Sequence, residues 1–447
     1  MKKIRLFISG IYFHPYFFLW GLLIVLLTFL SYYIPVLYII SMVLFCVWVS
    51  AVLMDLYLLH IRKNPIFAER ETAQRLSNGD DNPVYLDIAN LYPFPVKLQI
   101  IDEAPDQFQL RDRIFRIDMK SGEEIRLSYT LKPTKRGEYR FGKINVFSQS
   151  PLCLIRRRHK LGEELSVAVY PSIIQLRKYE LRAISQHLSL YGIKKIRKIG
   201  NNNEFEKIKE YVSGDDVRTI NWKATAKRSH LMVNQYIEER AQPIYNIIDM
   251  GRSMKMPFNG MTLLDYSINA SLVLSNIALQ KYDQAGLVTF GKEIQEFIVA
   301  DRKKNQLHKI LEGLYKQKTQ FPESSFEGLQ LHCKRKINRR SLCIIYTNFE
   351  SADSMRRQLP YLRSIAKNHV VLVVFFYNVE LKKLIEGEVR DTEDIYIKTI
   401  AAKLEFEKRQ IVRELKMHGI YSVLTTPEAL TIDAINKYLW IKSQGII

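Results

Sequence analysis

Two groups of polar residues after residue 200 have types and spacings that could do chemistry. The first is the run Asp249-Met250-Gly251-Arg252-Ser253, which directly follows an apolar stretch typical of a buried strand. In an open α/β sheet, ligands bind beyond the carboxyl ends of the strands, and a small hard cation takes oxygen ligands from several such loops. The carboxylate and the hydroxyl of this run therefore indicate a candidate cation site.

The second group is a block of charged and aromatic residues between residues 204 and 227. Gly214 and Asp215 fit a turn in which the carboxylate accepts backbone N–H groups. Arg218 is spaced to pair with a carboxylate such as Asp216 or Glu210. The block therefore predicts a turn held together by charged side chains.

Trp222 is expected to be the apolar anchor of this block. The block could be a polar clasp that fixes the segment to the edge of a sheet, or it could be a surface that binds a partner. Both interpretations stay open, because buried arginine–carboxylate pairs occur in both kinds of site. The candidate partner-binding residues are Glu210, Tyr211, Gly214, Asp215, Arg218, Asn221 and Trp222.

The block resembles the signature of the DUF58 family. The chain reads EF at 204–205 and EYVSGDDVRTINWKATAK at 210–227, against the family pattern EF-x-x-[RK]-E-Y-x-x-G-D-x-x-R-x-I-x-W-x-x-x-A, with Lys209 where arginine is usual. The resemblance extends to RGEY at 136–139, SPLCL at 150–154, VYP at 169–171 and YLWIK at 438–442, and so spans the chain.

The resemblance implies a von Willebrand factor A-like domain, whose D-x-S-x-S loop holds Mg²⁺. Here Gly251 replaces the first serine of that loop, and Asn348 stands in the place of the usual aspartate. One direct ligand and one negative charge are missing, so we expect a metal-free loop, with Mg²⁺ binding as the alternative. The residues at the family's metal positions are Asp249, Ser253, Ser324 or Ser325, and Asn348.

From residue 243 onward, short apolar runs alternate with amphipathic helical patterns, as in an α/β doubly wound sheet. Strands are expected at 244–249, 285–290, 342–346, 370–376 and 420–424, with an edge strand at 293–299. We assign residues 204–447 to the signature block and this α/β domain.

Residues 65–172 are predicted to form an antiparallel β-sandwich. Val96, Leu98 and Ile100 alternate with Lys97 and Gln99, and later runs repeat this period of two between glycine-containing turns. A basic linker is expected at 173–203.

The first 64 residues are predicted to form a two-helix transmembrane hairpin. The apolar runs at 17–33 and 36–59 are each long enough for a hydrocarbon core of about 30 Å. Asp55, the one charge within them, is expected to snorkel or to pair the helices. Basic residues flank both ends of the hairpin, so both termini are expected on the cytoplasmic side of a bacterial inner membrane. A cleaved signal peptide is the competing interpretation.

The chain is basic, with 66 Lys and Arg against 46 Asp and Glu and a net charge of +20. The basic runs at 156–160 and 334–340 have no interleaved aromatic residues, so we expect solvated faces or lipid contacts and no nucleic acid. No nucleotide-binding, metalloprotease or serine-hydrolase motif occurs, and the four cysteines form no C-x-x-C pair.

The DUF58 resemblance implies a partner, an AAA+ ATPase of the MoxR type. We therefore expect a membrane-anchored adaptor or assembly protein, not an enzyme, that works with such an ATPase and unknown client proteins on envelope complexes. The alternatives are a metal-dependent hydrolase acting through Asp249 and Asp215, and a structural scaffold of a membrane complex.

Overall fold

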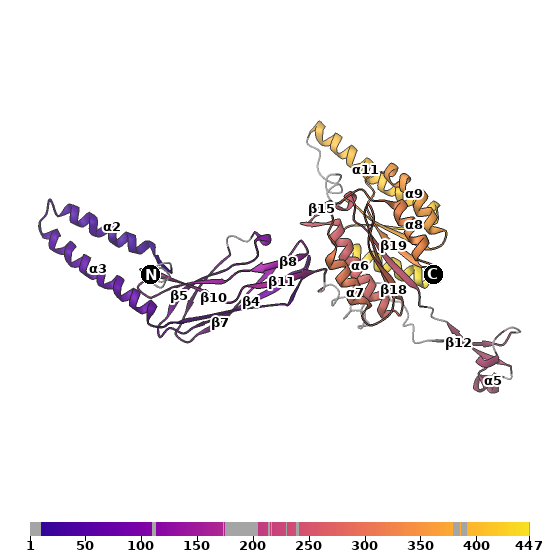
Figure 1. Cartoon of the computed structure of the whole chain (residues 1–447), viewed down its shortest axis with the longest axis horizontal. Helices are drawn as coiled ribbons and strands as arrows, with labels where there is room; N and C mark the ends of the chain where they lie inside the picture. The colour runs from indigo at the N-terminus through magenta and orange to yellow at the C-terminus, as the bar shows by residue number, and fades with distance from the viewer. Residues whose placement is uncertain are drawn as a thin grey trace. The chain divides into compact units, whose positions relative to one another are not determined.

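The structure is a computed structural model that describes residues 10–109, 113–172, 174, 204–212, 215, 217–228, 230–237, 241–378, 385 and 391–446. The chain divides into two compact units, Met1–Tyr170 and Pro171–Ile447 (Figure 1). Apart from Ile174, the linker predicted at 173–203 lies outside the described residues.

Two apolar helices, α2 (Pro15–Leu30) and α3 (Val36–His60), lie side by side at the start of the N-terminal unit (Figure 1). Pro15 is the first residue of α2. A backbone N–H at this position would have no partner within the helix, so the N–H that proline lacks is not needed there. Among the described helices, α3 with its 25 residues is long and apolar enough to cross a membrane. The 16 residues of α2 span only about 24 Å as a helix, so a crossing by α2 stays a prediction.

The rest of the N-terminal unit is β-rich. Three sheets, ordered β1-β10-β9-β5-β6, β2-β4-β7 and β3-β11-β8, share one hydrophobic core. The strands are β1 (Ile11–Phe13), β2 (Ile66–Thr72), β3 (Arg75–Ser77), β4 (Asn82–Asn90), β5 (Val96–Asp102), β6 (Ile114–Met119), β7 (Glu124–Leu131), β8 (Gly137–Phe141), β9 (Ile144–Gln149), β10 (Ile155–Leu161) and β11 (Leu165–Tyr170).

The expectation of purely antiparallel pairing is wrong at one place. β3 pairs with β11 in parallel, with Leu76 opposite Val169. Parallel neighbours need a long connection, and here nearly the whole β-rich region lies between the two strands in sequence. Periodicity predicts a strand but not the direction of its partner.

Asp55 neither snorkels nor pairs the helices, so that expectation is wrong. Its buried carboxylate accepts hydrogen bonds from the hydroxyl of Ser150 and from the backbone N–H groups of Leu154 (3.0 Å) and Ile155 (2.8 Å). These three donors lie in the connection between β9 and β10 and at the first residue of β10. The carboxylate therefore fastens α3 to the β-rich region.

Part of the basic run at 156–160 stabilises the same junction. Arg157 donates to the carbonyl oxygens of Leu59 (2.5 Å) and Arg62 (3.3 Å) at the end of α3. Arg158 donates to the side-chain oxygen of Asn145 from two nitrogens, at 2.9 and 2.7 Å. These two arginines therefore have structural partners within the chain.

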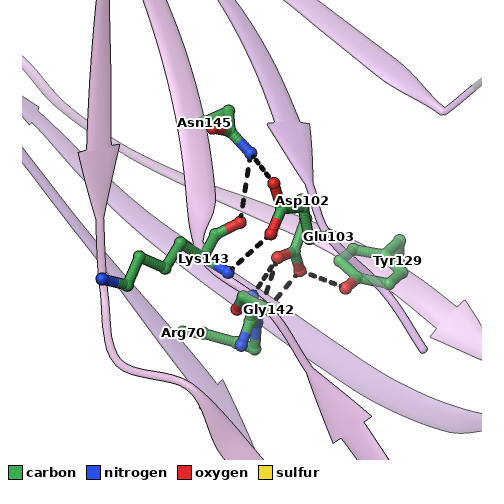
Figure 2. Close-up of polar contacts among 7 residues, drawn as sticks. All are labelled: Arg70, Asp102, Glu103, Tyr129, Gly142, Lys143 and Asn145. Atoms are coloured by element: carbon green, nitrogen blue, oxygen red, sulfur yellow. Dashed lines mark hydrogen bonds and ion pairs between the residues drawn. The ribbon is translucent and has the colours of Figure 1, made fainter.

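A buried ion pair connects two of the sheets (Figure 2). Arg70 of β2 pairs with Asp102 of β5, and their side chains are 4% and 3% exposed. Asp102 also accepts the hydroxyl of Tyr129 on β7, and Arg70 donates to the carbonyl of Gly142 (2.9 Å). Beside them, Glu103 accepts from the amides of Lys143 and Asn145 (Figure 2).

The second unit contains a six-stranded sheet in the order β18-β17-β14-β19-β20-β21. Five strands are parallel, and the edge strand β18 is antiparallel to β17. The strands are β14 (Pro243–Asp249), β17 (Gln284–Phe290), β18 (Ile294–Asp301), β19 (Leu342–Tyr346), β20 (Val370–Phe376) and β21 (Tyr421–Thr425). All six were predicted from their apolar runs, with ends that differ by two residues or fewer.

Helices cover both faces of this sheet, which explains why β14, β19 and β20 are buried along their whole length. One core packs α6 (Leu263–Gln280), α7 (Gln306–Lys316) and α12 (Leu430–Ser443) on one face. A second core packs α8 (Phe326–Lys336), α9 (Ala352–Ala366) and α11 (Thr392–Met417) on the other. A short hairpin, β15 (Pro257–Phe258) and β16 (Met261–Thr262), precedes α6.

The signature block forms a separate small element of this unit. β12 (Glu204–Glu210) and β13 (Met232–Ile237) pair antiparallel, and α5 (Trp222–Arg228) lies between them in sequence. The short 3-10 helix Val217–Thr219 precedes α5, and Ile220 forms a bridge to Val233.

Candidate functional site

The carboxyl edge of the six-stranded sheet carries an open crevice at the tips of β14 and β19. The strand register places Ile248 opposite Tyr346, so the residues that follow them, Asp249 and Thr347, meet at this edge. The crevice is lined by Asp249, Arg252, Ser253, Glu323, Ser324, Phe326, Thr347, Asn348, Phe349, Glu350, Ser354, Arg357 and Gln358.

Asp249 is buried at the base of this crevice, and both of its carboxylate oxygens accept hydrogen bonds from the protein. One oxygen accepts from the backbone N–H of Gly251 (2.8 Å) and from the hydroxyl of Ser324. The other accepts from the hydroxyl of Thr347 (2.6 Å). Burial raises the pKa of Asp249, and these three hydrogen bonds oppose that shift. Thr347 is not among the site residues predicted from the sequence, although it directly follows an apolar strand.

The structure separates the two serines that the sequence left as alternatives. Ser324 bonds to Asp249, whereas Ser325 caps α8 by accepting from the backbone N–H of Gly328 (3.1 Å). Ser253 lies in the 3-10 helix Arg252–Met254, and its carbonyl accepts from the side-chain amide of Asn348 (3.4 Å).

Asn348 is bound to a cationic side chain that the sequence analysis also missed. Its amide oxygen accepts a hydrogen bond from the ammonium group of Lys408 on α11 (2.9 Å), and the same ammonium donates to the carbonyl of Phe349. Burial lowers the pKa of Lys408 to about 8, and Glu350 opposes this shift. Lys408 is 60 residues from Asn348 in sequence, and no local sequence pattern predicts the contact between them.

These donors do not fit a Mg²⁺ ion as they are arranged. Mg²⁺ needs near-octahedral oxygen ligands that are free to bind it. The oxygens of Asp249 are already engaged by protein donors, the oxygen of Asn348 faces Lys408, and residue 251 has no side chain. Within the part of the chain that the structure describes, no group of three or more His, Cys, Asp or Glu could hold a metal ion.

The space that a serine at position 251 would need is filled by Ser324. A Cβ atom added to Gly251 would lie 1.8 Å from the Ser324 hydroxyl and 3.0 Å from the Pro322 carbonyl. Gly251→Ser should therefore displace Ser324 from Asp249 and lower the free energy of unfolding by about 1–3 kcal/mol. Urea denaturation of the detergent-solubilised chain measures this. Gly251→Ser combined with Ser324→Gly should recover much of the loss, and an unchanged single variant would contradict the packing argument.

In the signature block, Asp215 forms the turn that the sequence predicts. Its carboxylate accepts from the backbone N–H of Val212 (3.0 Å) and from the ammonium group of Lys209 (2.7 Å). These contacts hold the pKa of Asp215 below its usual range, the Lys209 hydrogen bond being the larger cause. Gly214, Asp216 and the side chain of Arg218 lie outside the described residues, so the predicted Arg218 pairing stays a prediction.

Asn221 organises the next turn. Its amide oxygen accepts from the backbone N–H of Ala224 (3.0 Å), which caps α5, and its amide nitrogen donates to Asn234 on β13 (2.8 Å). The backbone of Tyr211 bonds to Leu231 (2.8 Å), and Glu210 ends β12 with an exposed side chain. The polar residues of the block thus stabilise its own hairpin.

Trp222 is not an internal anchor, because its side chain is 70% exposed at the start of α5. Val212, Val217 and Leu231 in the same element are also exposed. We call these four residues the Trp222 surface. The three aliphatic members were missed by the sequence analysis, although apolar residues within a strongly polar block were a signal that could have found them.

Together these features define an α/β sheet protein with a polar crevice at the strand tips and several exposed apolar residues in its signature block. Residues 207–415, just under half of the chain, match the family model described as "Protein of unknown function DUF58". The chain is also 24% identical over 245 residues to "Uncharacterized protein YeaD" of Bacillus subtilis (strain 168), covering 53% of this chain and 58% of that protein. Both matches support the DUF58 family, and the match spans less than two thirds of YeaD's length.

Two solved structures resemble parts of the chain at low similarity. The SpRpn10 VWA domain is 12% identical, with a TM-score of 0.25, over 44% of this chain and 94% of that domain. The CARDB domain of the PF1109 protein from Pyrococcus furiosus is 14% identical, with a TM-score of 0.17, over 23% of this chain and 86% of that domain. At these scores neither likeness carries an argument.

Proposed function

We propose that this chain is a membrane-anchored, cytoplasm-facing adaptor or assembly protein of the DUF58 family. It would work with a MoxR-type AAA+ ATPase on envelope protein complexes, a role taken from the family resemblance. The observation that carries the proposal is the Trp222 surface, an exposed tryptophan together with three other exposed aliphatic residues in the family's signature block.

An exposed tryptophan on a stable framework is the kind of residue that dominates protein–protein binding energy. The framework here is the β12–β13 hairpin, with its turns held by Asp215 and Asn221. Several exposed apolar residues within one small element favour a protein-binding site. A protein partner that buries Trp222 is therefore the simplest use of this surface.

The α/β domain of the proposal is von Willebrand factor A-like. Its strand order, with one antiparallel edge strand and helices on both faces, and the Asp249 loop at the strand tip support this assignment. In the proposed role, this strand-tip edge is a second recognition surface for client proteins.

The membrane part of the proposal is a hairpin of α2 and α3 with both chain ends in the cytoplasm. Support comes from the length and composition of α3, its contact with the shorter α2, and the basic residues on both sides of the helix pair. The junction at Asp55 would hold the β-rich region close to the bilayer.

The two alternative functions, a metal-dependent hydrolase and a structural scaffold, require different features of the molecule. A hydrolase acting through Asp249 and Asp215 needs carboxylate oxygens that are free for metal or water, and both groups here bond to protein donors. A scaffold would use its surfaces without an ATPase. Affinity capture separates the three classes.

Trp222→Ala is expected to leave the fold intact, because the side chain is mostly exposed, and to reduce capture of a MoxR-type ATPase by about tenfold or more. The measurement is affinity capture of the detergent-solubilised chain from membranes of the native bacterium, with quantitative mass spectrometry of what copurifies. Leu331→Ala, at an exposed apolar position of α8, is the matched control and should keep the ATPase.

Loss of the ATPase with Trp222→Ala but not with Leu331→Ala would support the adaptor. If the wild-type chain captures no ATPase, the adaptor proposal fails. In that case substrate-dependent hydrolysis that Asp249→Asn abolishes would favour the enzyme, and stable capture of other membrane proteins would favour the scaffold.

A further inference from the structure

Lys408 places a half-buried cation next to the strand-tip crevice. It lies on α11, and its ammonium group reaches the loop after β19, where it donates to the side-chain oxygen of Asn348 and to the carbonyl of Phe349. The ring of Phe375 lies 5.9 Å from the same nitrogen. A charged group in such a place is expected to have oxygen partners, and Lys408 has two.

The lysine also determines what Asn348 can do. The amide oxygen of Asn348 faces Lys408, and the amide nitrogen faces the carbonyl of Ser253 in the Asp249 loop. Both ends of the side chain are therefore used, and the amide bridges the lysine to that loop. A second cation that approached Asn348 would have to displace the ammonium group.

Several charged side chains line the crevice next to Lys408. Its lining includes the carboxylates of Asp249, Glu323 and Glu350, together with Arg252 and Arg357. Both arginines and both glutamates are exposed to solvent, which screens them. Lys408 is screened much less, because it is largely enclosed between α11 and the sheet.

We propose that the ammonium group of Lys408 takes the place of a divalent cation at this edge of the sheet. It donates hydrogen bonds to the oxygens of the loop after β19, holds Asn348 against the Asp249 loop, and keeps divalent metal ions out. The edge then presents the same loops in a fixed arrangement that is independent of Mg²⁺ concentration.

The test compares Asn348→Asp with and without Lys408→Met in the detergent-solubilised full chain. Mn²⁺ is the probe, and its free concentration is followed by electron paramagnetic resonance. The wild-type chain and Asn348→Asp should bind Mn²⁺ weakly, because Lys408 remains. Asn348→Asp with Lys408→Met should bind at least about tenfold more tightly, because it adds a negative ligand and removes the competing cation. Adding Asp249→Asn should abolish the gain.

The matched control is Asn348→Asp with Lys403→Met, which removes an exposed lysine from the same helix and should not raise the affinity. Circular dichroism verifies the fold, and Lys408→Gln replaces Lys408→Met if the methionine variant does not fold. Stoichiometric Mn²⁺ binding by the wild-type chain that Asp249→Asn removes would overturn the proposal. So would equal affinities of the Asn348→Asp variants with and without Lys408.

Discussion

Asp55→Ala is expected to lower the free energy of unfolding of the N-terminal unit by about 3–5 kcal/mol. The substitution removes a buried carboxylate that accepts from the Ser150 hydroxyl and from the backbone N–H groups of Leu154 and Ile155. The two N–H groups would remain buried without an acceptor. Because the donors lie in the β9–β10 connection and at the start of β10, and the acceptor lies on α3, the loss would loosen the helix from the β-rich region.

Thermal unfolding of the detergent-solubilised chain measures this effect, which corresponds to a fall in midpoint of roughly 10 °C for a unit of this size. Asp55→Asn should lie between the wild type and Asp55→Ala, because the amide keeps one acceptor oxygen. Asp118→Ala, on the exposed side of β6, is the control and should change little. If Asp55→Ala unfolds at the same midpoint temperature as the wild type, the junction contributes no stability.

Arg70→Met is expected to have an effect of similar size, about 3–5 kcal/mol, because it leaves the carboxylate of Asp102 buried without its countercharge. The double variant Arg70→Met with Asp102→Leu should recover most of this loss. Apolar side chains of similar volume often replace a buried ion pair with little change in stability. A small deficit should remain, because the Tyr129 hydroxyl loses its acceptor.

Strand β2 also provides the control for this experiment. Arg126 of β7 pairs with Glu71 of β2 on the surface, with side chains 51% and 63% exposed. Arg126→Met should therefore change the free energy of unfolding by less than about 1 kcal/mol. Urea denaturation of the four proteins measures all these differences. If the double variant is as unstable as Arg70→Met, the burial of an unpaired charge is not the cause.

The sequence alone was sufficient for the α/β sheet and for the apolar helix α3. Strands β14, β19 and β20 are short, mainly apolar runs, and α3 is a mainly apolar stretch whose one acidic residue is Asp55. These signals are local, because the spacing of apolar residues within one element depends only on which of its faces are buried. The position of Asp249 at a strand tip followed from the same pattern.

The partners of the polar residues depended on tertiary structure. Ser150 is 95 residues from Asp55, Thr347 is 98 from Asp249, and Lys408 is 60 from Asn348. No periodicity encodes such pairs, because they form only when separate elements pack together. The choice of Ser324 over Ser325 beside Asp249 is of the same kind, since the start of α8 orients one serine toward the crevice and uses the other as its cap.

The exposure of Trp222 also depended on tertiary structure. The sequence determined that a tryptophan and several charged residues occupy the family's signature block, and it predicted the Asp215 turn from residue types alone. Whether the tryptophan packs inward or faces solvent depends on which surface the folded hairpin leaves uncovered. Local residue pattern therefore determined the elements of this protein, and the packing between elements decided which side chains meet at its sites.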